Sequence, residues 1–224
     1  MPRLAAFWSE SVLETHSYEF AFELAKTDIQ ERDLGELAIR AGVDYRQGVL
    51  VVPFLNRECT VRVGQETVEV LDEKGDEAPV WLAIVVLHYL LTATGEQLTG
   101  KLADFRQLVG GEAYLSVFSA RAVNRLVRSF GNDAASLLKV GLALGGKELD
   151  RGDVALEMPV LPRVPVTLIL WEGDDEFPPN ANIVFDSSIN GYLPTEDVVV
   201  ICQELVTLLQ SEVETNGQVH RRGR

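Results

Sequence analysis

The segment of residues 159–193 limits the possible folds of this chain most strongly, because it combines a long strand-like apolar run with the densest group of acids. Its run Val164–Trp171 (VPVTLILW) is aliphatic and β-branched, and its prolines are confined to the entry. This pattern predicts a strand that is buried on both faces. A second apolar run at residues 182–185 predicts another strand. The segment therefore predicts two strands joined by a charged loop.

The loop between these two strands is strongly acidic. Four acids in five residues surround Gly173, and the sequence Phe-Pro-Pro-Asn that follows favours a stiff turn. The candidate binding residues are the aromatic residue that ends the first strand, the loop acids and the acid that ends the second strand: Trp171, Glu172, Asp174, Asp175, Glu176 and Asp186.

Three interpretations of these acids remain open. The first is structural, with the acids solvated or bound to helix N-termini and arginines. The second is a site for a metal or a cationic ligand. Loops at the ends of adjacent strands can bring carboxylates together, and Asp174, Glu176 and Asp186 are the candidate ligands for a hard cation. The third is catalysis by a carboxylic acid of raised pKa beside an ionised partner.

Three stretches of the sequence carry a family resemblance. They are LPRVPVTLILWEGDDEFPPNANIVFDSSINGYLPTED, APVWLAIVVLHYLL and LTGKLADFRQLVGG, and the part WEGDDEFPPNA is the most specific. Over residues 20–209 the chain resembles a bacterial and archaeal family known as domain of unknown function 3786. Its members have no established activity, and some lie beside or are fused to iron–sulfur domains in anaerobes. The resemblance implies an accessory role in redox or corrinoid metabolism, although this chain lacks the cysteine set of an iron–sulfur cluster.

Composition indicates a folded protein with an acidic surface. The 224 residues are 46% hydrophobic, which is enough for a full core. A net charge of −14 repels nucleic acid and anionic membranes, although acidic surfaces are also common in proteins without a specific partner. We expect a single domain over residues 1–210 and a disordered polar tail over residues 211–224.

The same sequence features favour a cytoplasmic location. The N-terminal residues lack the apolar core of a signal peptide, and the apolar run at residues 80–91 is too short to span a bilayer. Cys59 and Cys202 are too few for a metal cluster or a thiolate zinc site. A reducing compartment is a simpler assumption than a disulfide between them.

The first half of the chain changes from helical to strand spacing and back. Helices are predicted at residues 8–27 and 31–41, and Gly42 ends the second. Apolar runs at Val49–Phe54, 59–63 and 67–71 predict a three-stranded antiparallel meander, with Arg62 and Glu69 together on its polar side. Val80–Thr92 predicts a buried central helix, in which His88 is interpreted as a satisfied core or rim residue.

Further helices are predicted at residues 114–130, 133–144 and 196–210, while residues 95–111 are typical of a loop. Arg121, Arg125 and Arg128 lie on one face of the first of these helices and form the only basic stripe in the sequence. One interpretation is an exposed face that pairs with nearby carboxylates. The other is an anion-binding surface, or a clamp onto the acidic loop at residues 172–176.

The sequence lacks the common catalytic motifs. Residues 95–102 and 141–148 each approach a phosphate-binding loop, but Leu102 and Glu148 occupy the place of the magnesium-binding hydroxyl. The sequence contains neither a Gly-x-Ser-x-Gly elbow nor a His-Glu-x-x-His zinc motif. His16, His88 and His220 are its only histidines. The sequence therefore identifies no nucleophile with its base, and no cofactor.

Together these patterns predict an α+β fold, with helices packed on a small antiparallel meander and a C-terminal strand region. We expect a non-catalytic binding or accessory module that engages a partner protein or a ligand through the acidic loop and a neighbouring groove. One alternative is a metal-dependent hydrolase or transferase that uses Asp174, Glu176 or Asp186. The other is a corrinoid- or iron–sulfur-linked maturation factor, which only the family resemblance implies.

Overall fold

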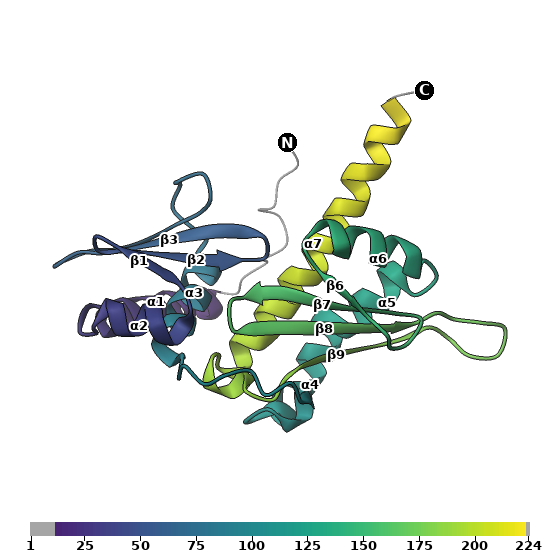
Figure 1. Cartoon of the computed structure of the whole chain (residues 1–224), viewed down its shortest axis with the longest axis horizontal. Helices are drawn as coiled ribbons and strands as arrows, with labels where there is room; N and C mark the ends of the chain where they lie inside the picture. The colour runs from purple at the N-terminus through teal and green to yellow at the C-terminus, as the bar shows by residue number, and fades with distance from the viewer. Residues whose placement is uncertain (1–11, 223–224) are drawn as a thin grey trace.

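The computed structural model describes the backbone of residues 12–222 and the side chains of residues 18–215. Two antiparallel sheets and the helices packed against them form an α+β architecture (Figure 1). The predicted fold class is therefore confirmed. The expected helix start at residues 8–11 and the side chains of His16 and His220 lie outside the described residues.

The first sheet is the predicted meander with one short strand added before it. Its strands pair in chain order: β1 (Asp44–Arg46), β2 (Val49–Phe54), β3 (Arg57–Val63) and β4 (Val68–Leu71). Leu55 and Asn56 connect β2 to β3 with φ values of 46° and 62°, which suit the tight turn of a twisted hairpin. Arg62 lies opposite Glu69, and the two side chains form an exposed ion pair of 3.7 Å, as expected from their shared polar side.

Three helices, α1 (Val12–Gln30), α2 (Leu34–Ala41) and α3 (Val80–Thr92), pack together beside this sheet (Figure 1). Helix α3 has the predicted bounds and is buried along most of its length, which makes it the central helix of this half. Asp33 caps α2 by accepting hydrogen bonds from the backbone N–H groups of Gly35 and Glu36. Gly42 ends α2 with a φ of 69°, a conformation that favours glycine.

The second sheet has the strand order β5-β9-β8-β7-β6. Its strands are β5 (Leu102–Asp104), β6 (Lys147–Leu149), β7 (Val154–Leu161), β8 (Val164–Trp171) and β9 (Asn180–Asp186). Strand β8 lies in the middle, and all of its residues except Pro165 and Trp171 are buried. The strands predicted at residues 164–171 and 182–185 are thus present as neighbours in one sheet.

Three strands of this sheet were not predicted. Strand β7 contains Pro159 opposite Pro165, and proline normally argues against a strand interior. The pairing register shifts between Pro159 and Leu161, so an irregularity accommodates the prolines. Strands β5 and β6 have three residues each, which is too short for a periodic pattern. The expectation of a loop over residues 95–111 is therefore corrected at β5.

The remaining helices cover this second sheet. They are α4 (Gly111–Phe118), a π-helical turn (Ser119–Val123), α5 (Asn124–Phe130), α6 (Ala134–Ala143) and α7 (Thr195–Arg222). The first three form the helix predicted at residues 114–130. Helix α7 continues beyond its expected end at Gln210, because Val213 still packs against the core. The polar tail expected from Ser211 is therefore helical as far as Arg222.

One cluster of buried residues joins the two sheets, with contributions from both sheets and from α3 and α7. The sheets also meet through the backbone, since the N–H of Leu55 donates to the carbonyl of Val160 at 3.0 Å. None of the helices in the described part of the chain is long and apolar enough to cross a membrane.

Candidate functional site

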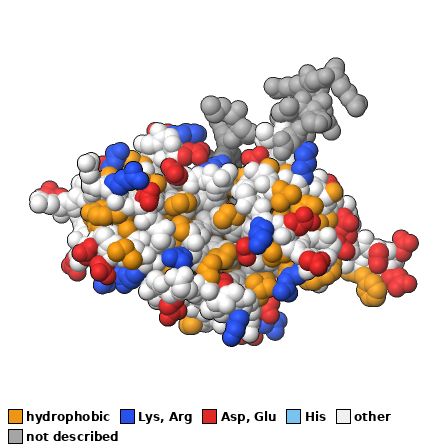
Figure 2. All heavy atoms as spheres, viewed as in Figure 1, with side chains coloured by type: hydrophobic (Ala, Val, Ile, Leu, Met, Phe, Trp, Pro, Cys, Tyr) orange, Lys and Arg blue, Asp and Glu red, His pale blue; other side chains and the backbone are white. Residues whose placement is uncertain are grey.

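The predicted acidic loop, residues 172–179, is the tip of the hairpin formed by β8 and β9. Figure 1 shows it extending away from the body of the molecule, and Figure 2 shows its acidic side chains gathered at that end. Trp171, Glu172, Asp174, Asp175 and Glu176 are all exposed to solvent. The structure therefore brings five of the predicted binding residues together on one projecting element.

The base of the loop is attached to the neighbouring helices. The Glu172 carboxylate accepts a hydrogen bond from the backbone N–H of Ala134 at 2.9 Å, at the start of α6. The Glu172 N–H donates to the Asp153 carboxylate at 2.7 Å. The Gly173 N–H donates to the carbonyl of Gly131 at 3.2 Å, at the end of α5. Glu172 thus has the structural role that was one of the three interpretations, because its carboxylate accepts a hydrogen bond from a free N–H group at the start of α6.

The outer part of the loop is closed by Asp174. Its carboxylate accepts hydrogen bonds from the backbone N–H groups of Glu176 and Phe177 at 2.8 and 2.7 Å. These two bonds lower the pKa of Asp174 below its ordinary value, because they favour the ionised form. Asp175 and Glu176 are left at the surface beside Phe177, whose side chain is 67% exposed. Trp171 is 40% exposed at the end of β8.

Asp186 lies at the opposite end of β9 from this loop. A strand of seven residues spans about 20 Å, so the expected convergence of Asp186 with Asp174 or Glu176 does not form. Among the described residues, no group of three or more His, Cys, Asp or Glu side chains is placed to hold a metal ion. The two loops lie apart because one precedes β9 and the other follows it.

The Asp186 carboxylate instead fastens a loop of the fold. It accepts hydrogen bonds from the backbone N–H groups of Thr99, Gly100 and Ser188 and from the hydroxyls of Thr99 and Ser188, at 2.7–3.0 Å. Burial raises the pKa of Asp186, but these hydrogen bonds outweigh burial and lower the pKa to about 2. Asp186 is therefore an ionised, fully bonded structural residue.

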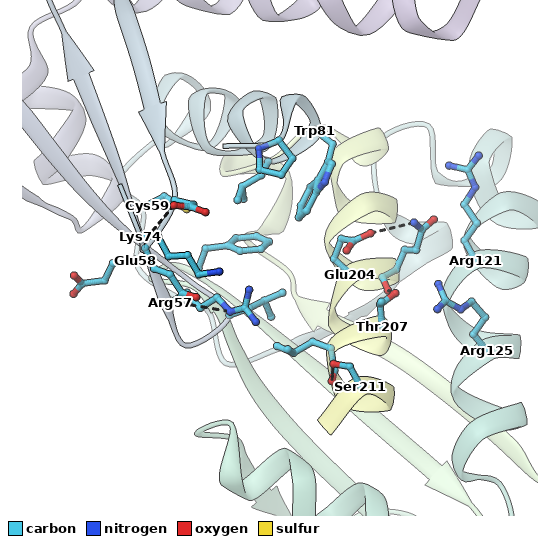
Figure 3. Close-up of a pocket in the computed structure, with 18 of the residues that line it drawn as sticks. Arg57, Glu58, Cys59, Lys74, Trp81, Arg121, Arg125, Glu204, Thr207 and Ser211 are labelled. Atoms are coloured by element: carbon cyan, nitrogen blue, oxygen red, sulfur yellow. Dashed lines mark hydrogen bonds and ion pairs between the residues drawn. The ribbon is translucent and has the colours of Figure 1, made fainter. Parts of the chain in front are cut away.

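The predicted arginine stripe lines a groove rather than contacting the acidic loop. The groove has a volume of about 790 Å³ and lies between the meander, α3, α7 and the helix formed by α4 and α5 (Figure 3). Arg121, Arg125 and Arg128 all line it. Within the described part of the chain, none of the three forms an ion pair with a carboxylate. The expected surface pairing and the expected clamp onto the acidic loop are both absent there.

The other walls of the groove combine aromatic, apolar and charged side chains. Phe54 and Trp81 form an aromatic pair with ring centroids 6.1 Å apart. Arg57 and Lys74 approach from the meander side, and Glu204 from α7 (Figure 3). Sequence reasoning identified the arginine stripe but not these facing residues. They come from three distant segments, and only the tertiary fold brings them together.

Glu204 is half-buried in the groove wall. Burial raises the pKa of Glu204, whereas the Gln203 amide and the Arg125 charge lower it. The net effect is a pKa above the ordinary value of a glutamate. Glu204 therefore takes up a proton more readily than an exposed glutamate does.

His88 is a partly buried residue with a hydrogen-bond partner, as expected. Its Nδ1 lies 2.7 Å from a carboxylate oxygen of Asp197, in the first turn of α7. The hydrogen bond with Asp197 raises the pKa of His88 above its ordinary value, against the opposing effect of burial. The pair joins α3 to α7.

Cys59 and Cys202 are both buried and form no disulfide. Burial raises the pKa of Cys59 to about 11, and it also raises the pKa of Cys202. Both thiols therefore remain protonated at neutral pH, which makes them poor nucleophiles.

Fold and site together define an α+β protein with two antiparallel sheets, a projecting acidic hairpin loop and an arginine-lined groove. The family model described as a domain of unknown function (DUF3786) matches residues 33–208. The chain belongs to this family, as its sequence resemblance indicated. No curated protein and no solved structure matches the chain.

Proposed function

We propose that this protein is a non-catalytic binding or accessory protein that docks a partner protein through its acidic loop. The observation that carries the proposal is the exposure of Phe177 and Trp171 beside the acids of the loop. Large aromatic side chains at the surface are typical of the central contacts of protein interfaces. The surrounding carboxylates favour a partner surface that is basic around an apolar pocket.

The attachment of the loop supports this proposal. The bonds of Glu172 and Gly173 hold its base, and Asp174 closes its tip. A loop that is already ordered loses little conformational entropy when it binds. Neither Trp171 nor Phe177 belongs to a buried cluster of the fold, so the apolar surface of both side chains is available for contact with a partner.

The two alternative functions have less support. The metal-dependent reaction uses Asp174, Glu176 or Asp186, but β9 separates Asp186 from the other two acids, and the Asp174 carboxylate is bonded to the backbone of its own loop. The corrinoid- or iron–sulfur-linked role rests on the family context, and no contact among the described residues favours it. We therefore propose neither.

The proposal is tested by quantitative co-purification from cells of the organism that encodes the protein. The tagged wild type is compared with a variant that carries Asp175→Asn, Glu176→Gln and Phe177→Ala. A matched control carries Glu31→Gln and Glu66→Gln, two exposed acids that lie outside both the loop and the groove. We expect at least one protein to be enriched with the wild type and the control and lost with the loop variant. An identical set of proteins with all three forms would contradict the proposal.

A further inference from the structure

Among the described residues, no carboxylate forms an ion pair with Arg121, Arg125 or Arg128 of the groove, although the chain as a whole is acidic. Arg125 donates from Nη2 to the side-chain oxygen of Gln210 at 2.8 Å, and Arg128 donates from Nε to the carbonyl of Asn124 at 3.2 Å. No hydrogen bond or ion pair within the described chain involves the Arg121 guanidinium. Guanidinium groups present several donors each, so much of their bonding capacity remains for a ligand.

A π-helical turn contributes to this wall of the groove. Arg121 lies within the turn Ser119–Val123, between α4 and α5. Such turns interrupt the regular helical hydrogen bonding and occur frequently at functional sites. The turn places Ala120 and Arg121 in the same groove wall as Arg125, one helical turn further on.

The facing side of the groove has an apolar part beside the charged residues of the meander. Trp81, at the start of α3, is half-buried and contacts Phe54, with their rings inclined at 58°. Leu208 of α7 lies along the same groove. Flat apolar groups pack well against aromatic side chains, and a volume of about 790 Å³ suits a small organic molecule. The groove therefore offers an arginine wall and a separate aromatic surface to one ligand.

The lining of the groove carries slightly more basic than acidic side chains, namely Arg57, Lys74, Arg121, Arg125 and Arg128 against Glu58, Asp72, Glu73 and Glu204. On the meander side Glu73 pairs with Arg57, and the Asp72 carboxylate accepts hydrogen bonds from the backbone of its own turn. The fourth acid, Glu204, lies on α7. It is the acid of α7 that senses the Arg125 charge, but the two groups do not form an ion pair. The positive charge of Arg121 and Arg125 is therefore only partly neutralised within the groove. An anionic ligand complements this charge, whereas a cationic ligand meets repulsion.

We propose that the groove binds a small organic anion, whose carboxylate, sulfonate or phosphate group contacts Arg121 and Arg125 and whose flat apolar part packs on Trp81. Guanidinium groups recognise all three anionic groups through paired N–H donors. This site is separate from the acidic loop, since no residue from 171 to 179 lines the groove. Binding in the groove is therefore independent of the proposed docking function of the loop.

The test uses two fluorescent probes that differ mainly in charge. One is 8-anilinonaphthalene-1-sulfonate, and the other is its uncharged counterpart N-phenyl-1-naphthylamine. Both are titrated into the wild type, into Arg121→Gln, and into the double variant Arg121→Gln with Arg125→Gln. A control variant carries Arg46→Gln and Arg62→Gln, which removes the same charge from the exposed meander. Thermal unfolding of each variant checks that the fold is retained, and Arg121→Gln removes no hydrogen bond of the described chain.

We expect saturable binding of the sulfonate, about tenfold weaker in Arg121→Gln and weaker still in the double variant. The uncharged probe binds all forms equally, and the control variant matches the wild type with both probes. Equal affinities of the two probes for the wild type, an unchanged sulfonate affinity in the double variant, or the absence of saturable binding would each overturn the inference.

Competition then identifies the anionic group that the groove prefers. Phenyl phosphate, benzoate and uncharged benzyl alcohol are used to displace the bound sulfonate probe. Displacement by phenyl phosphate alone assigns a phosphate ester, and displacement by benzoate alone assigns a carboxylate. Displacement by both supports an organic anion in general. If benzyl alcohol displaces the probe as well as the anions do, the arginines do not select the ligand and the inference fails.

Discussion

At the residue scale, Asp186 shows how a carboxylate that is typical of a site can serve the fold. It is buried at the end of β9. Its carboxylate holds Thr99 and Gly100, which lie in the loop before β5, close to Ser188. Its charge is satisfied by backbone N–H and hydroxyl donors, which are the partners that stabilise a buried anion. The sequence placed this acid correctly at a strand end but did not reveal these donors.

We predict that Asp186→Asn lowers the free energy of unfolding by about 2 kcal/mol at neutral pH, because the amide loses the charge that strengthens these bonds. The lowered pKa of Asp186 means that its contribution is complete above about pH 4 and is lost as the pH falls through about 2. The difference between wild type and variant should therefore shrink as the pH falls across this range. Urea unfolding at several pH values measures it, and a difference independent of pH would contradict the role of the charge.

His88 gives a prediction with the opposite pH dependence. Because the hydrogen bond to Asp197 raises the pKa of His88, its stabilisation is complete below the ordinary histidine value and is lost as the pH rises through the raised value. We expect His88→Gln to cost about 1 kcal/mol at mildly acidic pH and less at alkaline pH. An NMR titration should give His88 a pKa above 6.5. A measured pKa at or below that value would show that the pair contributes nothing.

At the element scale, the close approach of α6 to β7 depends on Gly141. A Cβ atom at this position would lie 2.3 Å from a methyl carbon of Leu156, which is fully buried. We predict that Gly141→Ala lowers the free energy of unfolding by about 2 kcal/mol, despite the better helix propensity of alanine. Leu142→Ala, at an exposed position of the same helix, should have a smaller effect. A stabilised Gly141→Ala protein would show that α6 moves away without cost.

The acidic loop yields a prediction about local order. Removing the Asp174 carboxylate with Asp174→Ala should accelerate amide hydrogen exchange at Glu176 and Phe177, because both N–H groups lose their acceptor. The melting temperature should stay the same, since the loop is exposed. Asp175→Ala is the matched control, because the Asp175 side chain is exposed and accepts neither of these two hydrogen bonds. Equal exchange in the two variants would mean that Asp174 does not order the loop.

Elements with a long, continuous apolar run were predictable from the sequence. The apolar helix Val80–Thr92 and the strand Val164–Trp171 have the predicted bounds, because burial on nearly all sides leaves a continuous apolar run. Strand β7 was not predicted, because Pro159 weakens the strand pattern and only the pairing irregularity makes it tolerable. The short strands β5 and β6 form because the longer strands β9 and β7 offer them free hydrogen-bonding edges. The local sequence of a short strand does not reveal such a neighbour.

The candidate site was predictable only in part. The spacing of Arg121 and Arg125 indicated a shared helix face, and the structure places both in one groove. The opposite wall depends on contacts between segments far apart in the chain, such as Phe54 with Trp81. The expected grouping of Asp186 with the loop acids was wrong, because strand direction rather than sequence proximity decides which ends of a hairpin meet.

At the scale of the whole molecule, an acidic loop and an arginine wall lie in separate parts of the structure. The acidic loop projects at one end of the molecule (Figure 1), while Arg121, Arg125 and Arg128 line the groove between the meander and the helices of the second half. An acidic chain of net charge −14 thus retains a local basic wall. The two regions are suited to partners of opposite charge, a basic protein surface at the loop and an organic anion in the groove.

The proposed docking of a partner protein by the acidic loop is tested most directly by site-specific photo-crosslinking. The photoreactive residue p-benzoylphenylalanine is introduced in place of Phe177, which is 67% exposed, or in place of Val109, which is 77% exposed and lies outside the loop. After irradiation of cells that produce each form, we predict a discrete crosslinked partner from position 177 and none of the same mass from position 109. The absence of a crosslink at position 177, or the same crosslinks from both positions, would contradict the claim.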